Sequence, residues 1–142
     1  MKRRVVVTGM GVLSPAGNSI PEFLKSLREG RSAYGPIQSF DTSHFPVKDA
    51  YEVKPFTPHV HGTHLLDPFI QYAVAAADEA LTNASFDPSQ YDPFQIGIVV
   101  SSSKGGVRTL DRFSDRFYRN PSAILGARIY CNSVDAYRIL RI

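Results

Sequence analysis

The sequence has a single cysteine, Cys131, and no apolar run long enough to cross a membrane. One cysteine excludes an internal disulfide and fits a reducing compartment. The opening MKRRVVVTG carries a basic pair, but it lacks both the apolar core and the cleavage site of a signal peptide. We therefore expect a soluble, cytoplasmic chain with no membrane partner.

The chain also lacks a block of charge of either sign, an internal repeat and a low-complexity segment. Its 16 basic and 13 acidic residues give a net charge of +3, and they are spread along the chain. This small excess slightly favours acidic partners and does not indicate nucleic-acid binding. With 142 residues, 43% of them apolar, the chain is expected to form one domain with a real core.

Two short apolar runs have the composition of buried β-strands. Arg4–Thr8 contains three consecutive valines and leads into a loop punctuated by glycines. Gln95–Ser101 reads QIGIVVS and stops shortly before a glycine pair. Such β-branched runs are typical of strands buried on both faces of a sheet.

Capping residues and apolar spacing predict three helices. Ser19 suits an N-cap with Glu22 completing a capping box, and Gly30 suits the end of the same helix. The clearest helix covers residues 66–82, where Asp67 suits the N-cap and a row of alanines forms a narrow face that permits close approach. The apolar residues of a third helix are Val107, Leu110, Phe113 and Phe117.

Residues 31–64 are rich in proline and show little periodicity. We expect irregular chain there, with short strands near Tyr51–Val53, that wraps a larger body or covers a site. The order strand, helix, loop, helix, strand, helix argues for an α/β architecture with a mostly parallel sheet covered by helices.

Four stretches in order resemble the amino-terminal part of the β-ketoacyl-[acyl-carrier-protein] synthases of the ketosynthase II type. They are VVVTGMGVLSPAGN (Val5–Asn18), FDTSHFPVK (Phe40–Lys48), DPFIQYAVAAADEAL (Asp67–Leu81) and IGIVVSSSKGGV (Ile96–Val107). On this resemblance, residues 1–119 are expected to be the amino-terminal part of such a domain and 120–142 a divergent tail. A fragment, a premature stop or a frameshift would each explain that tail.

The resemblance implies a thiolase-type fold, in which two similar α/β halves each hold a sheet covered by helices. This chain would supply a partial thiolase-like fold, the first half of the first α/β half. The resemblance also implies a homodimer, acyl carrier protein as partner, and a decarboxylating Claisen condensation. In that reaction a cysteine accepts the acyl group, and two histidines assist loss of carbon dioxide from malonyl thioester.

The same resemblance places the catalytic cysteine and both histidines beyond the matched residues, so no catalytic residue is assigned. Cys131 lies between Tyr130 and Asn132, which is not the family's Thr-Ala-Cys context, and we expect an ordinary small apolar side chain there. The chain as given is therefore expected to be an inactive amino-terminal fragment. The alternative is a non-catalytic truncated subunit that pairs with a ketosynthase or binds acyl carrier protein.

The site candidates are Ser103, Lys104, Gly105 and Gly106, a turn that the resemblance places near the acyl pocket and the dimer contact. Position 104 is more usually apolar in the fatty-acid enzymes, and an unpaired buried lysine is costly. Either Lys104 reaches solvent or a carboxylate, or the pocket of the parent enzyme does not take a long plain acyl chain.

Two glycine-containing patterns fall short of nucleotide-binding motifs. After Gly9-x-Gly11, a dinucleotide loop needs a third glycine at position 14, which is Ser14 in this chain. It also needs an acidic residue about twenty positions further on, at the end of a strand, whereas the nearest acid, Glu29, ends a predicted helix. The stretch SSSKGG lacks the residue order of a phosphate loop. A small nucleotide-binding domain is the least favoured hypothesis, and no cofactor is expected.

Histidines and arginines form two further patterns. The three histidines of HVHGTH, residues 59–64, stand in a Pro-rich segment apart from His44, and we expect a solvated loop with no metal. The third helix interleaves basic and aromatic residues, which would suit docking of an acidic carrier protein, although solvated arginines on an amphipathic helix explain it more simply. Its basic residues are Arg108, Arg112, Arg116 and Arg119.

Overall fold

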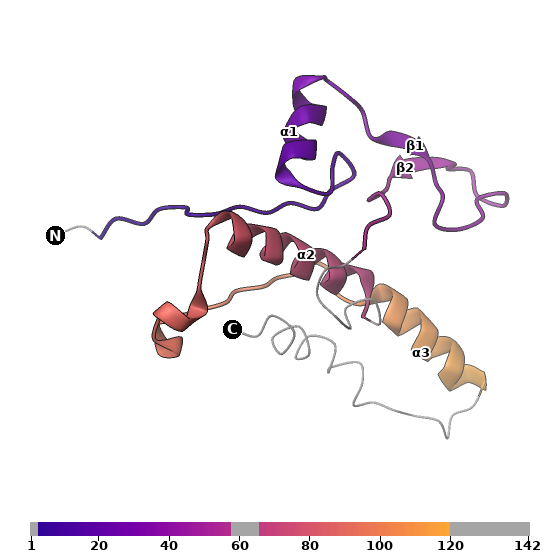
Figure 1. Cartoon of the computed structure of the whole chain (residues 1–142). Helices are drawn as coiled ribbons and strands as arrows, with labels where there is room; N and C mark the ends of the chain where they lie inside the picture. The colour runs from indigo at the N-terminus through magenta and orange to yellow at the C-terminus, as the bar shows by residue number, and fades with distance from the viewer. Residues whose placement is uncertain (1–2, 58–65, 120–142) are drawn as a thin grey trace. The chain divides into compact units, whose positions relative to one another are not determined.

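The computed structural model describes residues 3–57 and 66–119 (Figure 1). These residues fall into two compact units. Among the described residues, the first unit holds those up to Thr57 together with Ala76–Ser85, and the second holds 66–75 with those from Phe86 onward. Helix α2, Pro68–Asn83, therefore contributes its first half to one unit and its second half to the other.

Helix α1 of the first unit, Ile20–Arg28, begins and ends where the sequence predicts. The Ser19 hydroxyl accepts the N–H of Glu22 at 3.4 Å, and Gly30 follows the helix with a φ of +60°. The Glu22 carboxylate accepts the N–H of Asn18 at 2.9 Å, so the capping box closes one residue before the N-cap.

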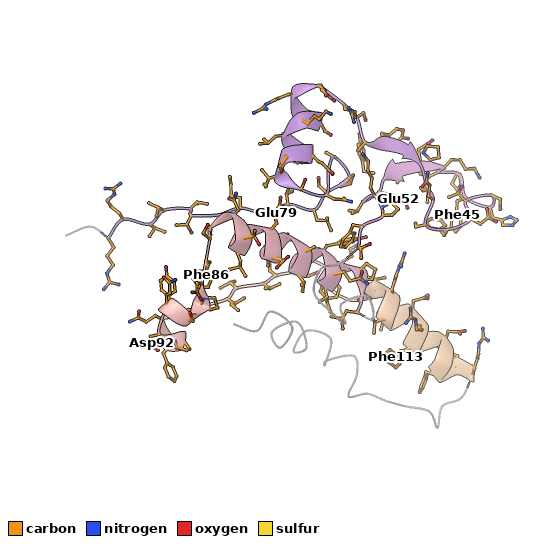
Figure 2. All side chains as sticks on the ribbon, in the orientation of Figure 1. Phe45, Glu52, Glu79, Phe86, Asp92 and Phe113 are labelled. Atoms are coloured by element: carbon orange, nitrogen blue, oxygen red, sulfur yellow. The ribbon has the colours of Figure 1, made fainter. Side chains whose placement is uncertain are left out.

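The one sheet within the described ranges is an antiparallel pair in the first unit. Strand β1, Tyr34–Pro36, pairs with strand β2, Asp49–Tyr51, in the register Gly35 opposite Ala50. The short strand expected near Tyr51–Val53 is present and begins earlier. Beyond the pair, the carboxylate of Glu52, the residue after β2, accepts the N–H of Gln38 at 2.6 Å and so ties the end of β2 to the segment that follows β1 (Figure 2).

Glycines in the first loop lie directly against the alanine face of α2. A Cβ on Gly11 would stand 1.9 Å from the carbonyl oxygen of Ala76, and a Cβ on Gly9 would stand 2.2 Å from that of Ala80. Only glycine permits this approach. The close contact expected of the alanine face is confirmed, and the helix occupies the space beside both glycines.

In the second unit, the first half of α2 supplies the buried apolar residues. Ile70 and Val74 are each 2% exposed. Two 3₁₀ turns, η2 (Pro88–Gln90) and η3 (Pro93–Gln95), lead toward helix α3, Val107–Arg119, which confirms the third predicted helix. No helix in the described ranges is long and apolar enough to span a membrane.

The two buried strands predicted from valine-rich runs do not form in the described residues. Arg4–Thr8 and 96–101 are extended without a ladder partner, Gln95 ends η3, and Val5 and Val99 are 94% and 97% exposed. The expectation of burial on both faces is wrong for this chain, and no parallel sheet is present in the described ranges. A strand needs a neighbour to pair with, and valine content alone supplies none.

Candidate site at the start of helix α3

The turn Ser103–Gly106 leads into α3 through a glycine in the left-handed region. Gly105 has a φ of +62°, which favours glycine. Its N–H donates to the Ser102 hydroxyl at 3.0 Å, and its carbonyl oxygen accepts the N–H of Val107 at 3.0 Å. The sequence therefore predicts the turn correctly, because the glycine pair marks it.

A buried carboxylate holds the start of α3 from outside that helix. Asp67 is 8% exposed, and its Oδ2 accepts both the N–H and the hydroxyl of Thr109 at 3.0 Å each. Thr109 is the third residue of α3, where helical N–H groups lack partners within the helix. A negative charge at a helix N-terminus is also favourable.

The role expected for Asp67 is different from the one that its carboxylate plays. The residue does stand directly before α2, and its carbonyl oxygen accepts the N–H of Ile70 at 2.9 Å. The Oδ2 atom, however, accepts hydrogen bonds from Thr109 of α3, which lies 42 residues further along the chain. Sequence spacing gave no signal for a bond over that distance.

Gly106 completes this arrangement by leaving room for the carboxylate. A Cβ at position 106 would stand 3.2 Å from Oδ2 of Asp67 and 3.5 Å from Cε1 of Phe69. Ser103 and Lys104, in contrast, are exposed. The four predicted site residues therefore divide into a solvent-facing pair and a pair that adjoins α3.

The same carboxylate argues against a phosphate site in SSSKGG. A phosphate at the α3 N-terminus would have to displace or approach the charge of Asp67, which already takes the N–H of Thr109. The basic-aromatic pattern of α3 is largely solvent-facing, with Phe117 48% and Tyr118 83% exposed. Arg119 pairs with Asp115 at 2.9 Å on the surface, where an ion pair contributes little.

Other candidates are exposed or lie outside the described residues. Cys131 and the histidines of residues 59–64 lie outside them, and His44 is exposed. Within 3–57 and 66–119, no group of three or more His, Cys, Asp or Glu side chains is arranged to hold a metal ion.

A second carboxylate, which the sequence did not mark as functional, organises the first unit. Glu79 of α2 accepts the N–H of Val12 at 2.8 Å and that of Ile20 at 2.7 Å (Figure 2). Ile20 is the first residue of α1, so this carboxylate also stands at a helix N-terminus. The sequence signal that could have marked Glu79 is its position as an acidic residue among the alanines of the packing face of α2.

Hydrogen bonds lower the pKa of three carboxylates, of which Asp41 and Asp87 are exposed and Glu52 is half-buried. The backbone N–H and then the hydroxyl of Ser43 lower the pKa of Asp41. The Ser39 hydroxyl, followed by the N–H of Gln38, lowers the pKa of Glu52. The Ser89 hydroxyl, followed by the Gln90 amide, lowers the pKa of Asp87. Asp41 and Asp87 each close a local turn, whereas Glu52 accepts from residues 13 and 14 positions earlier in the chain, and none of the three points to proton-transfer chemistry.

Comparison with known proteins finds one matching family model and relatives that share a name with one another. The sequence model of the family described as "Beta-ketoacyl synthase, N-terminal domain" matches residues 2–134. The chain is 33% identical over 118 residues to 3-oxoacyl-[acyl-carrier-protein] synthase 2 of Coxiella burnetii, covering 80% of this chain and 28% of that protein. It is 37% identical over 114 residues to the protein of the same name in Vibrio cholerae, covering 78% and 28%.

A polyketide protein and a solved structure also match. The putative polyketide beta-ketoacyl synthase 1 of Streptomyces cyaneus is 36% identical over 116 residues, covering 78% of this chain and 27% of that protein. A chain of the ishigamide ketosynthase/chain length factor matches with a TM-score of 0.74 at 33% identity, covering 84% of this chain and 30% of that one. The chain thus spans less than a third of the relatives that it matches.

Proposed function

Because this chain belongs to the β-ketoacyl synthase family, we propose that it forms the amino-terminal part of a 3-oxoacyl-[acyl-carrier-protein] synthase. The observation that carries the proposal is the family match over residues 2–134. The reaction would be the decarboxylating Claisen condensation of fatty-acid or polyketide biosynthesis. Identities of 37% to a synthase 2 and 36% to a polyketide synthase do not separate these two pathways.

The fold has the thiolase-like α/β character of the ketosynthase that it matches at a TM-score of 0.74. We propose that the extended segments around Val6 and Val99 become strands of a mostly parallel sheet once neighbouring strands are available. Their exposure, 67% and 97%, supports this, because apolar surface of that extent normally marks an interface. We further propose a cytoplasmic homodimer that receives substrates from acyl carrier protein, and a boundary after residue 119.

The 142 residues given are proposed to carry no condensing activity on their own. Acyl transfer needs an activated thiolate, and the context of Cys131 does not match that of the family's nucleophile. Purified chain incubated with malonyl- and acyl-carrier protein tests this. We expect no β-ketoacyl product, and any product above background would refute the proposal.

The turn Ser103–Gly106 is proposed to adjoin the acyl pocket and the dimer contact. Lys104 is exposed in the described chain, so its charge stays in solvent and needs no carboxylate partner. The alternative proposal is that the acyl pocket of the assembled enzyme does not accept a long plain acyl chain. A crystal structure of an assembled enzyme with an eight-carbon acyl group beside Lys104 would overturn that alternative.

A second candidate function is a non-catalytic subunit that pairs with a ketosynthase or binds acyl carrier protein. The structural match to a ketosynthase/chain length factor favours it. Co-purification with a full-length ketosynthase would support this candidate, whereas an isolated monomer or aggregate in the presence of that partner would count against it.

A further inference from the structure

The hydrogen bonds between Asp67 and Thr109 join the start of α2 to the start of α3, next to the Ser103–Gly106 turn. We propose that Asp67 is a positioning residue that fixes this turn by holding the first turn of α3 through Thr109. The significance of the turn rests on the proposed function, which places it at the acyl pocket or dimer contact. The positioning itself depends only on contacts within this chain.

One oxygen atom performs both parts of the positioning. Oδ2 of Asp67 accepts the N–H and the hydroxyl of Thr109 at 3.0 Å each. The same atom stands 3.2 Å from where a Cβ of Gly106 would lie. The first turn of α3 and the Ser103–Gly106 turn therefore both contact the same atom, Oδ2 of Asp67.

Burial makes this arrangement hard to replace. Asp67 is 8% exposed, and a carboxylate removed from water needs hydrogen-bond donors. Thr109 supplies two of them, one from its backbone N–H in the first turn of α3 and one from its hydroxyl. Loss of the carboxylate therefore removes a partner from the first turn of α3.

The other hydrogen bonds of the turn among the described residues are local: the carbonyl oxygens of Gly105 and Gly106 accept the N–H groups of Val107 and Leu110. The Gly105 N–H is held by the Ser102 hydroxyl, and both Ser102 and Lys104 are exposed. Gly106, which leads into α3, thus lies beside the buried Asp67, whereas Ser103 and Lys104 face solvent. The conformation of the turn should follow the position of α3.

Amide hydrogen exchange on the full chain tests the proposal. Asp67→Ala and Thr109→Val are expected to accelerate exchange at residues 105–110 by about tenfold or more, since bonds to charged groups are the stronger ones. Thr109→Ser, which keeps the hydroxyl, should restore slow exchange. Asp115→Asn on the exposed side of the same helix is the matched control and should leave those amides unchanged. The amides of α1, in the other unit, are the internal reference.

Unchanged exchange at 105–110 in both variants would overturn the proposal, as would equal acceleration in α1 and α3. If Asp67→Ala unfolds the chain, the comparison of Thr109→Val with Thr109→Ser decides alone, and equal exchange in these two would contradict the positioning role. A failure of the proposed function would appear instead as the absence of a Thr-Ala-Cys context from every reading frame downstream of codon 119, and would leave the exchange result standing.

Discussion

The N–H of Ile20, the first residue of α1, donates to the carboxylate of Glu79 at 2.7 Å across 59 residues of sequence. The second oxygen of the same carboxylate accepts the N–H of Val12 at 2.8 Å. Asp67, just before the same helix, holds Thr109 of α3 in the same manner. Helix α2 and the residue before it thus supply carboxylates to the N-termini of two other helices.

We expect Glu79→Ala to loosen α1 and the loop before it. The change removes two hydrogen bonds to a charged acceptor, each contributing about 1.5–3 kcal/mol. Glu79→Gln keeps one acceptor oxygen and should have an intermediate effect. Faster amide exchange at Val12 and Ile20 is the measurement, and Asp78→Asn on the same helix is the control. Equal protection in Glu79→Ala and the original chain would contradict this role.

Gly11→Ala should disrupt the packing of the first loop on α2. The added methyl would stand 1.9 Å from the Ala76 carbonyl oxygen, so the loop must move, and overpacking of this kind costs about 1–3 kcal/mol. Gly35→Ala is the matched control, because nothing lies within 4 Å of its Cβ position. Thermal unfolding monitored by circular dichroism should show a lower midpoint for the first variant only. Equal midpoints would show that the contact with α2 is not made.

The hairpin should weaken in acid because of Glu52. Hydrogen bonds from Ser39 and Gln38 lower its folded pKa below the ordinary value of 4.5. A lowered folded pKa means that its contribution to stability is complete above pH 4.5 and is lost as the pH falls through the folded value. Proton-detected titration of the Glu52 side chain should show the low midpoint, and Ser39→Ala should raise it. A midpoint unaffected by Ser39→Ala would contradict this assignment.

The isolated chain is expected to fold marginally or to aggregate. Val5, Val6 and Val7 are 94%, 67% and 79% exposed in an extended segment, which is an open site for strand pairing. Size-exclusion chromatography should show self-associated material, and the double change Val5→Lys and Val7→Lys should reduce it. A cooperative, monodisperse monomer of the unchanged chain would show that these valines need no cover.

The helices could be predicted from sequence because their signals are local. Ser19 caps α1 and Gly30 follows it as expected, and the alanine row of α2 receives Gly11 closely. The strands could not, because strand formation depends on partners outside the valine runs. Val5 and Val99 have suitable side chains, yet the described residues place no strand beside them.

The candidate site divides in the same way. The Gly105–Gly106 turn is evident from the sequence because glycine permits the φ of +62° found at Gly105. The bond from Thr109 to Asp67 was not predicted, because it joins residues 42 positions apart. The position of Asp67 directly before α2 instead predicts that Asp67 caps that helix. Local patterns thus locate the turn, and tertiary packing alone determines what holds it.

The central claim is that this chain is the front part of a ketosynthase and does not contain its reactive centre. The coding DNA downstream of codon 119, read in all three frames, tests this most directly. We predict a frame that encodes Thr-Ala-Cys followed by Ala, Ser or Thr, with the two histidine segments further along. The absence of that context from every frame would contradict the claim and favour a genuine short protein.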